Sequence, residues 1–333
     1  MRLKENILTN QLLNYSNRDC SIDIYKGIGI ILMVLDHIAV GYYFGYGIHS
    51  FHMPMFFFAS GLLFKGKTNI PILAYTKKKA KSLLIPYLLF GMVGAVLYTI
   101  TNGIDTDVLS NLLFYNTRKM PIVGAIWFLT SFFISVIGYY IFTRLFYDKP
   151  IFLTIIICLL GLAGTVGGLN FLPWGGAAAA VGIVFIYIGD CVRRTAIVLR
   201  TVKMCPIWVS MSLFAVSVLL TFKNEYVNMR LSNYGNVIIF WVTSVTAVIS
   251  LYSIACHLST FKAISEVVGW FGRNSLLILG SNQIFIAITQ KLLSFTKLIG
   301  FTMTIATIIL VFIEIYMFCT LYNILKSKVK STN

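Results

Sequence analysis

The sequence predicts an all-α, polytopic integral membrane protein with about ten transmembrane helices. Of its 333 residues, 58% are hydrophobic and only 11% are charged, and the mean hydropathy is +0.84. A soluble domain carries roughly 25% charged residues. A hydrocarbon core about 30 Å thick takes roughly 20 apolar residues per helix. Because lipid offers no partners to bare backbone groups, helices are the expected spanning elements.

The apolar runs follow one another along the whole chain, separated by charged residues or by Gly, Pro and Asn. They predict spans at 22–43, 51–64, 82–101, 121–143, 150–168, 176–190, 205–222, 236–256, 264–290 and 298–323. The second run is short, and the ninth is interrupted near Gly269–Asn274. We expect one membrane domain over 22–325, a cytoplasmic N-terminal segment over 1–21, and a basic cytoplasmic tail over 326–333.

The positions of Lys and Arg predict the orientation in the membrane. The formal net charge of +16 arises from short basic clusters between apolar runs, a topology signal rather than a nucleic-acid-binding face, so no nucleic acid partner is expected. Cytoplasmic loops are enriched in Lys and Arg. With both termini cytoplasmic, Lys26 lies inside the first helix, and the outer loops hold only Arg118, Lys119, Lys223, Arg230, Lys291 and Lys297. The expected location is the cell membrane, in contact with its lipids.

The six cysteines are scattered and show no CxxC spacing. Closely spaced pairs are typical of zinc sites and disulfide frameworks. The sequence therefore predicts neither, and we expect no bound metal.

The first predicted helix carries four ionisable side chains: Asp23, Lys26, Asp36 and His37. A charge at the centre of a membrane helix costs roughly 2.5–3.5 kcal/mol, so such residues are functional candidates. Lys26 and His37 are eleven residues apart, which places them on nearly the same helix face, roughly 16 Å apart along the axis. Asp23 precedes Lys26 by one turn and can pair with it. The alternative is that Asp23 and Lys26 extend to the interface while His37 bonds a neighbouring helix.

Imidazole suits proton transfer at neutral pH, since its unperturbed pKa is about 6.5. His37 is therefore the leading catalytic candidate, and His52, near the outer side, is the second. Asp36 lies about 100° around the helix from His37, so we expect it to contact another helix. Glu314 is a further buried carboxylate, which either orients a histidine or bonds Tyr or Ser neighbours.

Several motifs occur together and in order. Asp23-x-x-Lys26 is followed by His37, then by Phe51-His52-Met53-Pro54 and Ser60-Gly61. Trp127-Phe128-Leu129, the segment 226–236 and Gly272-Arg273-Asn274-Ser275-Leu276 come later. From about residue 18 to 325, the chain resembles the acyltransferase 3 family of membrane acyltransferases, especially its single-domain members similar to fucose 4-O-acetylases.

The resemblance implies an O-acetyltransferase that moves an acyl group from acetyl-CoA, or a similar acyl-CoA, to a hydroxyl of a cell-surface glycan or lipid-linked sugar. His37 would act as general base or as acyl-accepting nucleophile, and His52 would meet the acceptor. Lys26, with Asp23, would bind the donor. Trp127, Arg230 and Asn282 would bind the acceptor. No cofactor would be held permanently, and polysaccharide biosynthesis proteins are the expected protein partners.

Two positions depart from the pattern of relatives. Lys26 stands where many have Arg, so an anion contact survives without the bidentate fork. Asn282 stands where many have His, and it cannot take up a proton.

A transporter or flippase of a polysaccharide precursor is the alternative function, with the buried Asp, His and Lys forming a proton or substrate path. Transporters of many folds contain inverted repeats and matched broken helices, and the sequence shows neither. The Lys26–His37 spacing followed by Phe51–Gly61 favours the acyltransferase. A non-catalytic scaffold or sensor is the third reading.

Overall fold

The computed structural model describes residues 19–65, 70–117, 120 and 122–331. Among these residues the regular secondary structure is helical, and the only β pairing is an isolated bridge between Asn228 and Asn233. This confirms the all-α class. Most of the expected N-terminal segment 1–21 and the end of the tail 326–333 lie outside the described residues.

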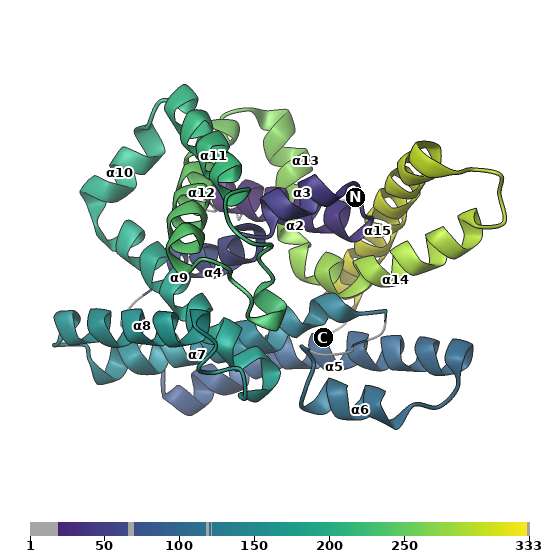
Figure 1. Ribbon diagram of the computed structural model, residues 1–333, viewed down its shortest axis with the longest axis horizontal. Helices are drawn as coiled ribbons and strands as arrows, with labels where there is room; N and C mark the ends of the chain where they lie inside the picture. The colour runs from purple at the N-terminus through teal and green to yellow at the C-terminus, as the bar shows by residue number, and fades with distance from the viewer. Residues whose placement is uncertain (1–18, 66–69, 118–119, 121, 332–333) are drawn as a thin grey trace.

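The helices follow one another along the chain with short connections (Figure 1). They are α2 Cys20–His37, α3 Tyr42–Ile48, α4 His52–Leu62, α5 Ile72–Asn102, α6 Thr106–Leu113, α7 Trp127–Leu145, α8 Pro150–Thr165, α9 Gly176–Arg194, α10 Ala196–Met204, α11 Ile207–Thr221, α12 Val237–Leu258, α13 Lys262–Arg273, α14 Ser275–Leu293 and α15 Gly300–Ser331. Three single 3₁₀ turns also occur. One, Gly124–Ile126, precedes α7; another, Pro173–Gly175, precedes α9; the third, Met229–Leu231, lies between α11 and α12.

The expected count of about ten spans is not confirmed. Within the described residues, six helices are long and apolar enough to cross a membrane, or seven if the pair α10 and α11, bent by 92°, is one span. The six are Ile72–Asn102, Gly124–Leu145, Pro173–Arg194, Val237–Leu258, Ser275–Leu293 and Gly300–Val329. α2 carries three charged residues, α4 has 11 residues and α8 has 16, so none of these three qualifies by itself.

Two expected spans are divided in the structure. The run 22–43 ends as a helix at His37, Ala39 takes a left-handed φ of 61°, and the chain restarts as the short helix α3. The run 264–290 divides at Asn274 into α13 and α14, inside the interruption that the sequence indicates. Conversely, the run 82–101 extends back to Ile72, so the basic segment Lys77–Lys81 is helical and continuous with the span.

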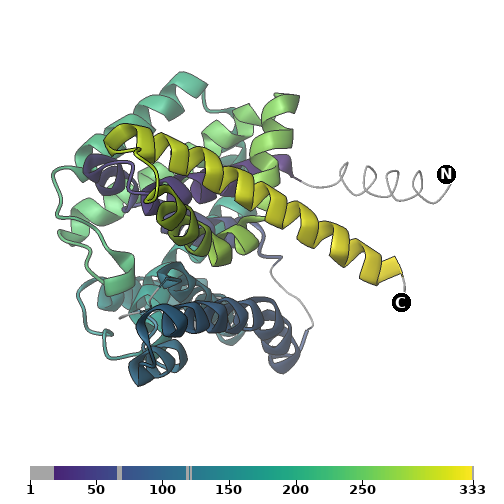
Figure 2. The same ribbon diagram turned by 90° about the vertical axis from the view of Figure 1, so that its right-hand side faces the viewer.

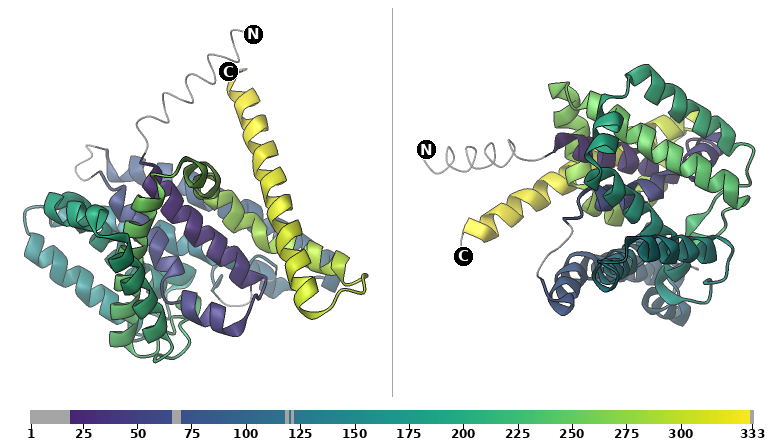
Figure 3. Two further views of the ribbon diagram at one scale, coloured as in Figure 1. Left: turned by 90° about the horizontal axis from the view of Figure 1, so that it is seen from above. Right: turned by 90° about the vertical axis from the view of Figure 1, so that its left-hand side faces the viewer.

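The helices form two stacked groups and one outlying pair. Figure 1 shows α5–α8 along the lower side, α2–α4 and α10–α13 above them, and α14 with α15 at the right. α9 packs against α4, α7 and α8 and so joins the two groups. The C-terminal half of α15 extends away from the other helices (Figures 2 and 3). Only 22% of the apolar windows of α5 and α15 is buried, despite mean hydropathies of 2.1 and 2.2, which fits helices that face lipid.

α2 lies at the centre of the upper group and contacts α4, α12, α13 and α14. The Asp19 side chain caps its N-terminus by accepting from the Ser21 backbone N–H. The fully buried Tyr25 donates its hydroxyl to the Val248 carbonyl oxygen of α12, 3.0 Å away. α2 and α13 approach so closely that a Cβ at Gly272 would lie 1.8 Å from the Asp23 carbonyl oxygen. Glycine is therefore required at this crossing.

Substituting Gly272→Ala should destabilise the protein, because a backbone carbonyl cannot rotate away from the added methyl group. Overpacking of this kind costs about 1–3 kcal/mol. Thermal unfolding of the purified protein in detergent measures the effect. Gly168→Ala is the control, since the nearest atom to its Cβ would be 3.6 Å away. Equal thermal unfolding midpoints for Gly272→Ala and Gly168→Ala would contradict this account of the α2–α13 contact.

Candidate active site

Two cavities follow one another between the same helices. α2, α4, α7 and α14 each supply residues to both, yet the cavities have no lining residue in common. Along α2 the order is Lys26 at the first cavity and His37 at the second, and along α4 it is Ser60 and then His52. The enclosure formed by these helices therefore has two chemically different ends.

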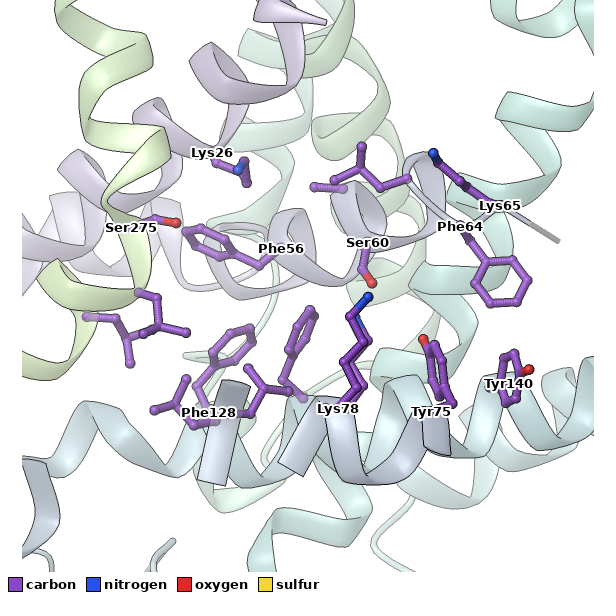
Figure 4. A pocket seen from close by; sticks show the side chains of 18 of the residues that line it. Lys26, Phe56, Ser60, Phe64, Lys65, Tyr75, Lys78, Phe128, Tyr140 and Ser275 are labelled. Carbon is purple, nitrogen blue, oxygen red and sulfur yellow. The ribbon is translucent and has the colours of Figure 1, made fainter. Parts of the chain in front are cut away.

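The first cavity, of about 560 Å³, has Lys26, Lys65, Lys78 and Lys79 among its lining residues. We name it the lysine cavity. None of the described residues that line it carries a carboxylate. Figure 4 shows the Lys78 side chain extending from α5 toward Ser60 of α4. Converging ammonium groups fit an anionic ligand.

The position of Lys26 is fixed within α2. Its ammonium group lies 3.1 Å from the Asp23 carboxylate one turn earlier, and the two side chains are 20% and 5% exposed. Asp23 does not itself line the cavity. The structure thus places Lys26 at the cavity and Asp23 behind it as its ion-pair partner.

Apolar and aromatic side chains line the rest of the lysine cavity. Phe128 stacks on Phe132 with ring centroids 5.2 Å apart and meets Phe56 edge-on at 5.8 Å. At the other end, Tyr75 of α5 stacks on Tyr140 of α7 at 4.0 Å, which holds the basic turn of α5 against α7. The cavity therefore suits a ligand with an anionic head and a less polar stem.

The second cavity, of about 340 Å³, contains His37, His49 and His52. We name it the histidine cavity. Trp127 and Arg230 also line it. The Arg230 Nε donates to the Thr117 carbonyl oxygen at 2.9 Å, which anchors the segment between α11 and α12 over the cavity. Trp127 faces this cavity while its neighbour Phe128 faces the lysine cavity, so the first turn of α7 forms part of the wall between them.

Hydrogen bonds fix the tautomer of His37. Its Nδ1 lies 2.8 Å from the Asn282 Oδ1. The Asn282 amide nitrogen donates to the carbonyl oxygens of Ile278 and Leu279 at 2.9 and 2.8 Å, so the amide oxygen must face His37. An amide oxygen only accepts. The neutral His37 ring therefore carries its proton on Nδ1 and keeps a lone pair on Nε2.

His52 has the same tautomer for a different reason. Its Nδ1 lies 2.9 Å from the carbonyl oxygen of Ile48, one turn earlier. Its Nε2 is therefore also unprotonated in the neutral ring. Two neutral imidazoles in one cavity can each take up a proton from a hydroxyl group.

Asn282 and Glu314 line neither cavity. Asn282 is fully buried with its amide oxygen against the His37 Nδ1, so it is placed to orient the His37 ring. Glu314 accepts hydrogen bonds from the Thr289 hydroxyl at 3.0 and 2.9 Å. Arg193 and Arg194 bind Asp190 at 2.7 and 3.0 Å and also line neither cavity.

His49 is the main residue that sequence reasoning missed. Its Nε2 lies 2.8 Å from the Asp36 carboxylate, which gives Asp36 the contact outside its own helix that the sequence predicts. His49 follows α3 and His52 opens α4, so their approach depends on the turn between the two helices and no helix periodicity marked it. Gln283, whose side-chain oxygen accepts from the Ala125 N–H at 2.7 Å, also lines the cavity, and no sequence signal marked it.

The model of the acyltransferase domain family matches residues 20–322, which includes nearly every residue of both cavities. The chain is a member of the acyltransferase 3 family. It is thus a multi-pass membrane acyltransferase. No curated protein and no solved structure matches the chain. Within this acyltransferase, His37 and the neighbouring lysine-lined cavity form the candidate active site.

Substituting Asn282→Leu should lower the turnover of the acyltransferase, because His37 would no longer be held with its proton on Nδ1. The loss should reach much of the roughly 10²–10⁴-fold that a positioned base contributes. Asn282→Asp, which keeps an acceptor oxygen against Nδ1, should retain more activity. Steady-state kinetics measures both.

Ser281→Ala is the matched control for Asn282. Ser281 is buried on the same helix, but its hydroxyl donates to the Leu277 carbonyl oxygen of that helix. If Asn282→Leu and Ser281→Ala had equal turnover, the orienting role of Asn282 would be refuted.

Proposed function

We propose that the protein transfers an acetyl or similar acyl group from acyl-CoA to a hydroxyl of a cell-surface glycan or lipid-linked sugar. The observation that supports this most directly is the pair of neighbouring cavities between the same four helices, one lined by lysines and the other by His37. CoA has phosphates at one end and a thioester at the other, joined by a long, narrow arm. The lysine cavity matches the phosphates, and its aromatic lining matches the arm.

In the proposed orientation both termini are cytoplasmic and the protein lies in the cell membrane. The lysine cavity then opens toward the cytoplasm, where acyl-CoA is made, and the histidine cavity lies toward the outer side, where a surface glycan would arrive. Trp127 and Arg230, which line the histidine cavity, would contact the acceptor sugar. Polysaccharide biosynthesis proteins would deliver that acceptor.

The transfer can proceed directly, without an acyl-enzyme, with His37 as the base. The acceptor hydroxyl oxygen attacks the thioester carbonyl carbon while the His37 Nε2 takes up the hydroxyl proton. The tetrahedral intermediate then collapses, the C–S bond breaks, and the departing CoA thiolate recovers the proton from His37. In the alternative, the His37 Nε2 attacks the thioester, the C–S bond breaks, and CoA leaves as the thiolate. The acceptor hydroxyl then attacks the acyl group on His37 while His52 takes up its proton, the C–N bond breaks, and His52 returns the proton to the thiolate.

The donor can be tested before the acceptor is known. In lipid discs, the wild-type protein should bind labelled acetyl-CoA saturably and release CoA slowly to water. His37→Ala should still bind the donor but lose turnover by roughly 10²-fold or more. His257→Ala is the matched control, because His257 bonds the Cys205 carbonyl oxygen and lines neither cavity. If His37→Ala turned over at the wild-type rate, the mechanism would be refuted. If the wild-type protein did not bind acetyl-CoA, the proposed donor would be refuted.

Lys26→Ala should raise the KM for acyl-CoA with a smaller effect on kcat, because the cation contacts the donor rather than the reacting atoms. Initial rates over a range of acyl-CoA concentrations separate the two constants. Lys262→Ala is the control, since the Lys262 side chain is 91% exposed and lines neither cavity. An unchanged KM for Lys26→Ala would remove Lys26 from the donor site.

A further inference from the structure

One cluster in the histidine cavity has no role in the mechanism above. Asp36, His49 and Tyr226 all line this cavity and come from α2, from the turn after α3 and from the segment before α12. The Asp36 Oδ2 lies 2.8 Å from the His49 Nε2, and the two side chains are 15% and 18% exposed. The Tyr226 hydroxyl lies 3.0 Å from the same nitrogen.

Both ring nitrogens of His49 face acceptors. The Nδ1 lies 3.2 Å from the Val227 carbonyl oxygen, and the Nε2 faces the Asp36 carboxylate. A carbonyl oxygen and a carboxylate can only accept. The Nε2, 2.8 Å from the carboxylate, therefore carries a proton and donates it to Asp36.

This pair determines what the Tyr226 hydroxyl can do. Because a protonated Nε2 has no lone pair, the Tyr226 hydroxyl cannot donate to it, so the Tyr226 oxygen accepts and the phenol proton is left to donate elsewhere. Tyr226 lies between α11 and α12, outside the spanning helices. Burial and, second, the charge of Asp36 raise the pKa of its phenol to about 12. The hydroxyl therefore keeps its proton at neutral pH.

The histidine cavity needs a donor of this kind. The His37 and His52 Nε2 atoms carry lone pairs, so neither can donate to an oxygen before it has taken up a proton. When a hydroxyl attacks a thioester, the carbonyl π electrons move to the oxygen, which becomes an oxyanion. Preorganised donors aimed at that oxygen are typically the largest single contribution to acyl transfer.

We propose that Tyr226 donates its hydroxyl proton in a hydrogen bond to this oxyanion, and that the Asp36–His49 pair positions Tyr226 for it. This role of Tyr226 rests on the proposed function. Tyr226 is then a catalytic residue, whereas Asp36 and His49 are positioning residues. The bond lasts while the intermediate exists and weakens when the C–S bond breaks and the carbonyl re-forms, so Tyr226 keeps its proton throughout.

The contact between Asp36 and Gly45 shows how closely the pair is enclosed. A Cβ at position 45 would lie 2.6 Å from the Asp36 Oδ1. A methyl group there would displace the carboxylate without removing any reacting group. Two residues along, a Cβ at Gly47 would meet nothing closer than Val218, at 3.4 Å. The two glycines therefore offer a matched pair of substitutions.

The test compares kcat and the KM for acetyl-CoA in purified variants in lipid discs. Removal of one oxyanion donor lowers kcat by about 10²–10³-fold, and Tyr226→Phe should do so with an unchanged KM. Tyr46→Phe is the control, because the Tyr46 hydroxyl donates to the Asn224 carbonyl oxygen and Tyr46 lies outside the cavity. Wild-type kcat for Tyr226→Phe would overturn the proposal.

Double substitutions test the positioning role. Asp36→Asn and Gly45→Ala should each lower kcat, and Gly47→Ala should not. Combined with Tyr226→Phe, Asp36→Asn should add little further loss, because it acts through Tyr226. Additive losses would show instead that Asp36 acts on its own. Release of CoA by the wild-type protein tests the proposed function separately. The ratio of each variant's kcat to the wild-type kcat tests the role of Tyr226.

Discussion

A helix with four ionisable side chains must be enclosed by protein, because lipid does not solvate a charge and a bare buried charge is costly. This constraint explains the position of α2. Four helices surround it, and the glycine at its crossing with α13 lets the two backbones touch. Each ionisable group of α2 then has a defined partner: Lys26 pairs with Asp23, Asp36 with His49, and His37 with Asn282.

The same enclosure separates two chemical environments along one axis. Each of the helices α2, α4, α7 and α14 contributes residues to the lysine cavity and to the histidine cavity. Aromatic side chains at the start of α7 lie between the two cavities. In the proposed function, a charged donor would bind at one end with its reactive group directed toward the other.

Much of this could be predicted from the sequence, because it depends on composition and on helix periodicity. The membrane class, the break near Asn274 and the shared face of Lys26 and His37 are of this kind. The partner of Asp36 could not be predicted, because its position depends on the left-handed turn at Ala39. That turn lies inside an apolar run whose sequence predicts one continuous helix. The role of Asn282 depends on how α14 docks against α2, which no local pattern encodes. The count of about ten spans is not confirmed, because α2 carries three charged residues and α4 and α8 are short.

The central claim is that acyl-CoA enters by the lysine cavity and reacts at His37. An experimental structure of His37→Ala in lipid discs with acetyl-CoA tests it most directly, because this variant should hold the donor intact. The phosphates should then lie against Lys26, Lys78 and Lys79, with the thioester directed past Phe56 and Phe128 toward position 37. CoA bound in the histidine cavity, or with its thioester directed away from position 37, would contradict the claim.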